Sequence, residues 1–123
     1  MNKKVLGIVI ALVLAMGFGI NYLANMPGPL DDFTKCLAEK ETIFYGSFLC
    51  PACQQQKSLF GSSKKYLPYI ECSNPDRSQT QACIDAEIEN YPTWFFGDGS
   101  VQTGILELEV LAEKSGCQLP SNE

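Results

Sequence analysis

Residues 48–54 (FLCPACQ) hold the side chains of this sequence that can do redox chemistry, two cysteines separated by two residues. Thiol–disulfide exchange needs an accessible thiolate that attacks or is attacked, and a second thiol that resolves the mixed disulfide. We assign the first role to Cys50 and the second to Cys53. The spacer, Pro51 and Ala52, carries no charge that would tune the pair further.

The flanking segments predict how this pair is held. Residues 42–48 (TIFYGSF) are rich in aromatic and β-branched side chains and read as a strand. Pro51 suits the first position of a helix, so Cys50 falls near a helix N-terminus. Backbone N–H groups and the helix dipole there favour a thiolate over a thiol. Cys53 lies three residues further on the same side of the first turn, within reach of a disulfide with Cys50.

Two other interpretations of the pair stay open. One is a permanent disulfide, although the small ring that two such cysteines close tends to be reducible. The other is a zinc site formed by Cys50, Cys53, Cys72 and Cys83. The ten residues between Cys72 and Cys83 fit poorly with the short-spaced pairs of structural zinc sites. The sequence contains no histidine, which excludes histidine general bases and imidazole ligands, and we expect neither a metal nor a cofactor.

The six cysteines form an even set, which suits an oxidising compartment. Cys72 ends a predicted strand and Cys83 lies in the next predicted helix, so we expect a disulfide across the turn 73–77. It can be structural or a relay. Cys36 and Cys117 remain near the two ends of the domain and would pair by elimination, closing a long loop worth about 4 kcal/mol at most.

The N-terminal segment predicts export of everything that follows it. Residues 1–4 form a short basic head, and residues 5–24 are apolar except for one asparagine, which is the length a bilayer requires. The positive-inside rule places the head in the cytoplasm and the domain in the periplasm or another extracytoplasmic space. A cleaved signal peptide, cut near residues 15–17, is the alternative. Residues 25–30 form a linker rich in Pro and Gly.

Length and charge limit what the exported part can be. The chain has 123 residues, and roughly 90 remain for one domain, residues 31–119, which disulfides would help to stabilise. From Asp31 onward there are seven basic and 14 acidic residues, against a net charge of −5 for the whole chain. Such an acidic surface argues against nucleic acid and anionic lipid as binding partners.

The order of predicted elements indicates an α/β domain. We expect a parallel strand pair joined through the cysteine-bearing helix, followed by an antiparallel hairpin in the same sheet. Trp94, Phe95 and Phe96 are expected in the core of the third strand. The predicted helices cover residues 31–41, 51–61, 80–90 and 106–115, and the predicted strands residues 42–48, 69–72, 93–96 and 100–103. Asp31 or Asp32 is expected to be the N-cap of the first helix, and Gly116 the C-cap of the last.

Residues 36–116 resemble the thioredoxin-like family, and most closely the thioredoxin-like domain fused to bacterial homologues of vitamin K epoxide reductase. The resemblance implies a thioredoxin-like fold, a four-stranded mixed central sheet flanked by helices. Its residues are Phe44-Tyr45-Gly46, Cys50-Pro51, Cys53-Gln54, Lys57, Leu59-Phe60-Gly61, Pro68 to Cys72, Cys83 and Tyr91 to Trp94.

The resemblance also implies properties of single residues. The Tyr91–Pro92 bond would be cis and face the cysteines, which leaves the Tyr91 backbone free to pair with an extended substrate, and Trp94 would border the pair. Two features depart from the family. One apolar segment stands in place of an integral-membrane quinone-reducing domain. Phe44 occupies the position where many thioredoxins carry a buried acid, which puts a carboxylate relay to Cys53 in doubt.

These observations together predict a membrane-anchored, extracytoplasmic thiol–disulfide oxidoreductase that promotes disulfide formation in exported proteins. The resemblance implies a quinone-linked membrane oxidase of the vitamin K epoxide reductase type as the electron acceptor. Two alternatives remain. The same site can act as a reductase or isomerase supplied by a membrane thiol donor. The chain can also be a non-catalytic binding protein with a static disulfide.

Overall fold

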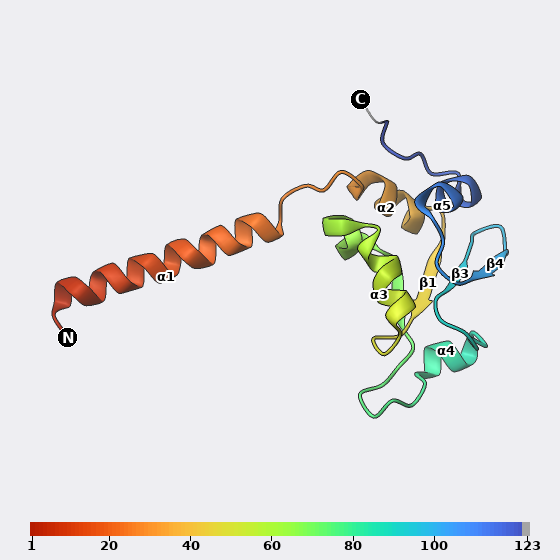
Figure 1. The fold of residues 1–123 in the computed structure, drawn as a ribbon, viewed down its shortest axis with the longest axis horizontal. Helices are drawn as coiled ribbons and strands as arrows, with labels where there is room; N and C mark the ends of the chain where they lie inside the picture. The colour runs from red at the N-terminus through yellow and green to blue at the C-terminus, as the bar shows by residue number, and fades with distance from the viewer. Residues whose placement is uncertain (122–123) are drawn as a thin grey trace.

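The computed structural model describes residues 1–121, which form five α-helices, one 3₁₀ helix and four β-strands. Helix α1 (Lys3–Ala24) extends away from the rest of the chain, which folds into an α/β domain (Figure 1). None of its residues is buried, and its mean hydropathy of 2.2 makes it long and apolar enough to cross a membrane. A signal sequence near an N-terminus has the same length and apolar composition.

The four strands form one mixed sheet in the order β2-β1-β3-β4. Strand β1 (Ile43–Gly46) lies in the centre and pairs in parallel with β2 (Tyr69–Glu71). Strand β3 (Thr93–Phe95) is antiparallel to β1, and β4 (Val101–Thr103) is antiparallel to β3. The predicted parallel pair and antiparallel hairpin in one sheet are confirmed, as is the thioredoxin-like arrangement after an N-terminal helix.

The remaining helices surround this sheet. They are α2 (Asp31–Glu39), α3 (Pro51–Ser58), the 3₁₀ helix η1 (Gly61–Tyr66), α4 (Gln81–Asp85) and α5 (Leu108–Ser115). Figure 1 shows α4 at the end of the domain opposite α2 and the linker to α1. The cysteine-bearing helix α3 runs between these two ends of the domain.

The main hydrophobic core lies between the sheet and helices α2, α3 and α5. Phe44 of β1 stacks on Trp94 of β3 with ring centroids 4.6 Å apart, and both side chains are fully buried. Leu37 and Leu111 close this core from α2 and α5. Because side chains alternate along a strand, Tyr45 points to the opposite face, where it packs with Ile88 and two buried cysteines.

The helix predicted over residues 80–90 is wrong in length, because α4 ends at Asp85. Glu87 adopts a φ of 56°, a left-handed conformation that an α-helix does not contain. The chain turns there, and Ile88 enters the second core cluster while its N–H bonds to the carbonyl of Cys83 at 2.9 Å. Burial of Ile88 therefore overrides the helical periodicity of the segment.

Other boundaries also differ from the prediction. Strand β1 is shorter than residues 42–48, α5 begins at Leu108, and the 3₁₀ helix η1 follows α3 where no element was expected. Gly116 caps α5 in a left-handed conformation, as predicted. The predicted domain includes residues 117–119, which follow α5 as irregular chain.

Asp31 lies within the first turn of α2, whereas the sequence suggested an N-cap. Its carboxylate accepts hydrogen bonds from the Ser63 hydroxyl at 2.7 Å and from the Gly28 N–H at 2.9 Å. These two bonds, the one from Ser63 above all, hold the pKa of Asp31 below its usual value. The same carboxylate thus attaches the linker that follows α1 to the middle of η1.

Candidate active site

Cys50 caps the N-terminus of α3, directly after the loop that leaves β1. Its sulfur accepts a hydrogen bond from the Cys53 N–H at 3.2 Å, and an N–H aimed at sulfur stabilises negative charge there. Pro51 occupies the first helical turn, as the sequence predicted. Cys50 is half-exposed, and its neighbours Phe48 and Leu49 are 48% and 44% exposed. The sulfur therefore lies at the surface beside apolar side chains that a protein partner can cover.

Cys53 lies one turn further and is fully buried in the main core beside Phe44 and Trp94. Burial, and then the hydrogen bond with Cys50, raises the pKa of the Cys53 thiol to about 12. At neutral pH this sulfur is therefore a protonated thiol, hidden from solvent. The two cysteines differ as the assigned roles require, with one accessible sulfur and one shielded sulfur.

A set of hydrogen bonds holds the loop before Cys50 in place. One carboxylate oxygen of Glu71 accepts from the Phe48 N–H at 2.9 Å and from the Ser73 N–H at 3.2 Å. The hydroxyl groups of Ser47 and Ser73 are 2.6 Å apart, and Ser47 also accepts from the Leu49 N–H at 3.1 Å. Hydrogen bonds from the end of β2 therefore hold the loop that precedes Cys50 in a defined conformation.

Tyr69 and Lys57 provide the polar surroundings of Cys53 in place of a buried acid. The Tyr69 phenol donates to Glu71, and the Lys57 ammonium lies 3.7 Å from the centroid of the Tyr69 ring. Burial, and then the bond to Glu71, raises the pKa of Tyr69 well above its usual value. Lys57 lies one helical turn after Cys53 and acts to lower the pKa of that thiol, against the larger effect of burial.

Gly46, the last residue of β1, leaves room for the Cys53 sulfur. A Cβ at this position would lie 2.8 Å from the Tyr69 ring and 3.1 Å from the sulfur of Cys53. Neither distance allows an unstrained contact, because carbon atoms pack at about 3.5–4.0 Å. The absence of a side chain at Gly46 is therefore part of how the Cys53 sulfur is accommodated between α3 and β1.

The Tyr91–Pro92 peptide bond is cis, as the resemblance implied. The Cys50 thiol points at the Tyr91 carbonyl oxygen across 3.7 Å, so this backbone lies directly beside the exposed sulfur. Trp94 is buried behind the pair, and its indole N–H donates to the side-chain oxygen of Gln56 at 3.3 Å. The structure thus brings together the cysteines, Tyr91, Pro92 and Trp94, as the sequence suggested.

The other four cysteines form two disulfides, Cys36–Cys117 and Cys72–Cys83. Both Cys72 and Cys83 are 0% exposed, so an external thiol cannot reach their sulfurs, and this favours a structural role over a relay. Because Cys72 and Cys83 are joined in a disulfide, neither can act as a thiolate ligand in a four-cysteine zinc site with Cys50 and Cys53. Within residues 1–121, no three Cys, Asp or Glu side chains are grouped to hold a metal ion.

Several residues around the pair escaped the sequence analysis. Gln56 is fully buried and bonds both the N–H and the carbonyl of Leu106, at 2.7 and 2.9 Å, which ties α3 to the chain after β4. Gln56 follows Cys53 by three residues, so helical spacing could have marked it. Glu71 is the last residue of β2 and Arg77 lies in the loop that follows it, and no local pattern relates either residue to Cys50.

Comparison with known proteins agrees with this chemistry. No family model matches the chain. The protein named thiol-disulfide oxidoreductase LTO1, from Arabidopsis thaliana, is 43% identical to it over 81 residues, which cover 61% of this chain and 21% of that protein. The chain therefore spans about a fifth of the length of this curated relative.

Proposed function

We propose that the chain is a thiol–disulfide oxidoreductase in which Cys50 exchanges with substrate sulfurs and Cys53 is its internal partner. Cys53 leaves when a client thiolate attacks Cys50, and it resolves the mixed disulfide when the exchange runs in the reducing direction. The observation that carries the proposal is the contrast within the pair. Cys50 is half-exposed at a helix N-terminus, whereas Cys53 is 0% exposed and has a pKa of about 12. A permanent structural disulfide would not need this contrast. The likeness to a protein named thiol-disulfide oxidoreductase supports the same function.

The direction we propose is oxidation of exported proteins. A client thiolate attacks the Cys50 sulfur of the Cys50–Cys53 disulfide, and Cys53 leaves and takes up a proton. A second client thiolate then attacks the client sulfur of the mixed disulfide and releases Cys50. The client loses two electrons and two protons as its two thiols become a disulfide. Cys50 and Cys53 gain two electrons and two protons as their disulfide becomes two thiols.

The proposed setting is outside the cytoplasmic membrane, with α1 as the anchor. The basic residues before α1 and the two structural disulfides support this placement. The linker is held at the η1 end of the domain, while Cys50 lies at the other end of α3. This arrangement leaves the exposed sulfur turned away from the attachment point and open to client proteins.

Continued turnover needs an oxidant for the dithiol. We propose a disulfide in a quinone-linked membrane oxidase of the vitamin K epoxide reductase type, which takes two electrons from Cys50 and Cys53. The resemblance of residues 36–116 supports this partner. A membrane anchor also raises the effective concentration of the domain near any membrane partner.

The test compares two single variants of the full chain in detergent micelles. Cys50→Ser should abolish oxidation of a reduced client protein, because no sulfur remains for the client to attack. Cys53→Ser, mixed with the client in its disulfide form, should instead accumulate a mixed disulfide, because Cys50 attacks the client disulfide and no second thiol in the chain displaces the client; non-reducing electrophoresis shows this species. A redox titration of the wild-type pair against glutathione measures its potential. Wild-type activity that survives in Cys50→Ser, or a pair that stays oxidised under mild reductant, would refute the proposal.

A further inference from the structure

A pocket of about 260 Å³ opens beside the exposed sulfur of Cys50. Its walls come from the loop before α3, from the segment after β2, and from Tyr91. The volume lies below the range of about 300–1,000 Å³ that is usual for small-molecule sites. It is large enough for a single side chain of a peptide whose cysteine reaches Cys50.

Arg77 gives this pocket its charge. It is the only arginine in a chain whose net charge is −5, and it is exposed at the pocket rim. One oxygen of the neighbouring Asp76 carboxylate is held by Ser78, since it accepts from the Ser78 N–H at 3.0 Å and from its hydroxyl at 2.5 Å. The Arg77 guanidinium is therefore the cationic group available to a ligand in this pocket.

The polar walls of the pocket are ordered by internal hydrogen bonds. Gln79 donates to the Tyr91 hydroxyl at 3.1 Å and to the Ile88 carbonyl at 2.7 Å. Ser47 and Ser73 are joined through their hydroxyl groups at 2.6 Å. A ligand thus meets a prearranged set of hydroxyl and amide groups, and little side-chain freedom is lost on binding.

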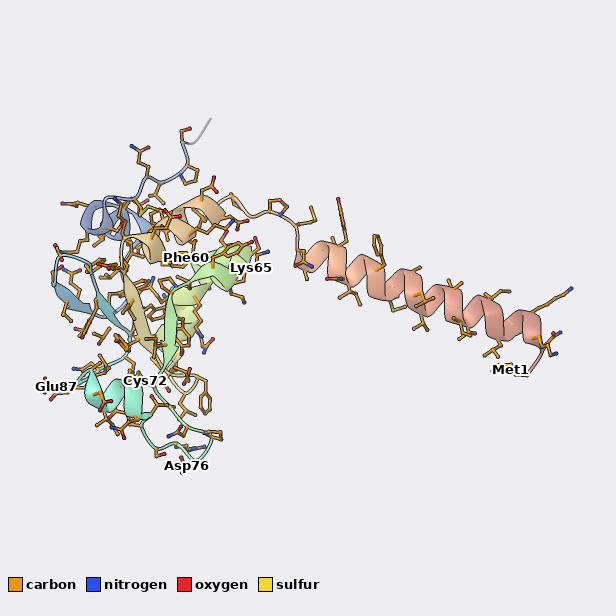
Figure 2. The ribbon with its side chains drawn as sticks, turned by 180° about the vertical axis from the view of Figure 1, so that it is seen from behind. Met1, Phe60, Lys65, Cys72, Asp76 and Glu87 are labelled. Atoms are coloured by element: carbon orange, nitrogen blue, oxygen red, sulfur yellow. A yellow bond between two sulfur atoms is a disulfide. The ribbon has the colours of Figure 1, made fainter. Side chains whose placement is uncertain are left out.

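The loop that carries Arg77 is itself fixed. Arg77 has a φ of 71°, a left-handed conformation that is strained for a residue with a side chain. Its N–H bonds to the Asn74 carbonyl at 2.9 Å, and Ser73 pairs with Gln79 across the loop. Figure 2 shows this loop, with Asp76 at its tip, at the same end of the domain as Cys72 and away from Phe60 and Lys65.

One acidic group close to the pocket needs to be accounted for. The Glu71 carboxylate lies next to Ser73, but it already accepts from the N–H groups of Phe48 and Ser73 and from the Tyr69 hydroxyl. These three bonds engage both carboxylate oxygens of Glu71, so the group already has partners and is not free to pair with the Arg77 guanidinium.

We propose that this pocket is a client subsite, in which Arg77 binds the carboxylate of an Asp or Glu that lies next to the reacting cysteine of an exported protein. Guanidinium is suited to this role because its planar donors match the two oxygens of a carboxylate. The inference rests on the proposed oxidoreductase function and adds a substrate preference to it.

The experiment uses the full-length chain in micelles with the Cys50–Cys53 disulfide formed. Reduced dithiol peptides carry Glu, Gln or Lys beside one cysteine, on its N-terminal side in one set and on its C-terminal side in another. Rates are followed by acid quench, alkylation and mass spectrometry. Each rate is divided by the rate of the same peptide with Arg77→Gln, which cancels differences in thiol reactivity between peptides.

In at least one set, this ratio should be about fivefold higher for the Glu peptide than for the Gln peptide, and lower still for Lys. The difference should shrink as salt is added, because the charges are near the surface. Lys64→Gln is the matched control. It removes the same charge from an exposed site on η1, and it should leave the order of the peptides unchanged.

Two results would overturn the inference. Equal ratios for all peptides in both sets would refute the subsite while leaving the oxidoreductase function in place. Failure of the wild-type chain to oxidise any peptide would refute the oxidoreductase function, and the subsite with it.

Discussion

Substitution of Gly46 by alanine tests how the buried cysteine is accommodated. The added Cβ would lie 2.8 Å from the Tyr69 ring, 3.1 Å from the Cys53 sulfur and 3.3 Å from the Phe44 ring. The Tyr69 ring cannot simply turn away, because its hydroxyl is bonded to Glu71. The Phe44 ring is fully buried and stacked in the core. The new methyl group therefore has to displace the sulfur or distort β1.

The expected cost follows from these contacts. Overpacking a dense core costs about 1–3 kcal/mol, and alanine recovers about 0.5–1 kcal/mol relative to glycine within a strand. We expect Gly46→Ala to lower the free energy of unfolding of the reduced chain by about 1–2 kcal/mol. Displacement of the Cys53 sulfur should also lengthen the lifetime of the mixed disulfide between Cys50 and a client.

Urea unfolding followed by near-ultraviolet circular dichroism measures the first effect, and quenched electrophoresis measures the second. The matched control repeats the substitution in a Tyr69→Val background, where the smaller side chain leaves room for the methyl group. The cost of Gly46→Ala should fall there by at least about 0.5 kcal/mol. A change in stability below about 0.5 kcal/mol in the wild-type background would contradict the packing we describe.

Three further predictions concern the surroundings of the pair. The Cys53 thiol ionises near pH 9.0 when unfolded and near 12 when folded, so alkali favours the unfolded state. Urea titrations from about pH 8 to about pH 10.5 should therefore show the reduced chain losing about 2 kcal/mol relative to Cys53→Ala, and equal slopes would contradict the burial of this thiol. Gln56→Leu leaves a buried indole N–H and two backbone groups without partners, so guanidinium unfolding should show a loss of about 2–4 kcal/mol, and a loss below about 1 kcal/mol would count against the bridge. Replacing Cys72 and Cys83 together by alanine should cost about 3 kcal/mol of stability and leave client oxidation intact, whereas a relay would lose that activity with the disulfide.

The features predicted well from the sequence depend on residues close together in the chain. Cys50 and Cys53 face the same way because three residues make almost one helical turn, and Pro51 and Gly116 mark where helices begin and end. The disulfide between Cys72 and Cys83 also spans a short turn. Such relations follow from backbone geometry and need no knowledge of the remaining fold.

The predictions that failed depend on packing between distant segments. The apolar spacing of residues 80–90 suited a helix, but α4 ends at Asp85 because Ile88 is drawn into a cluster with Tyr45 of β1. Asp31 looked like a helix cap, yet its carboxylate is held by Ser63, 32 residues further along the chain. In both cases a tertiary contact outweighed a local preference.

The sequence by itself determined the chemistry available to this protein: two thiols one helical turn apart, after a strand, in a chain with an apolar N-terminal segment and no histidine. Only the tertiary structure decided how the thiols differ: Cys53 is buried against Gly46 and Tyr69, whereas Cys50 is half-exposed in a pocket that Arg77 also lines. The reason is physical. Spacing along a helix is set by the backbone, whereas burial and charge at a sulfur depend on which strands and loops the sheet brings against it.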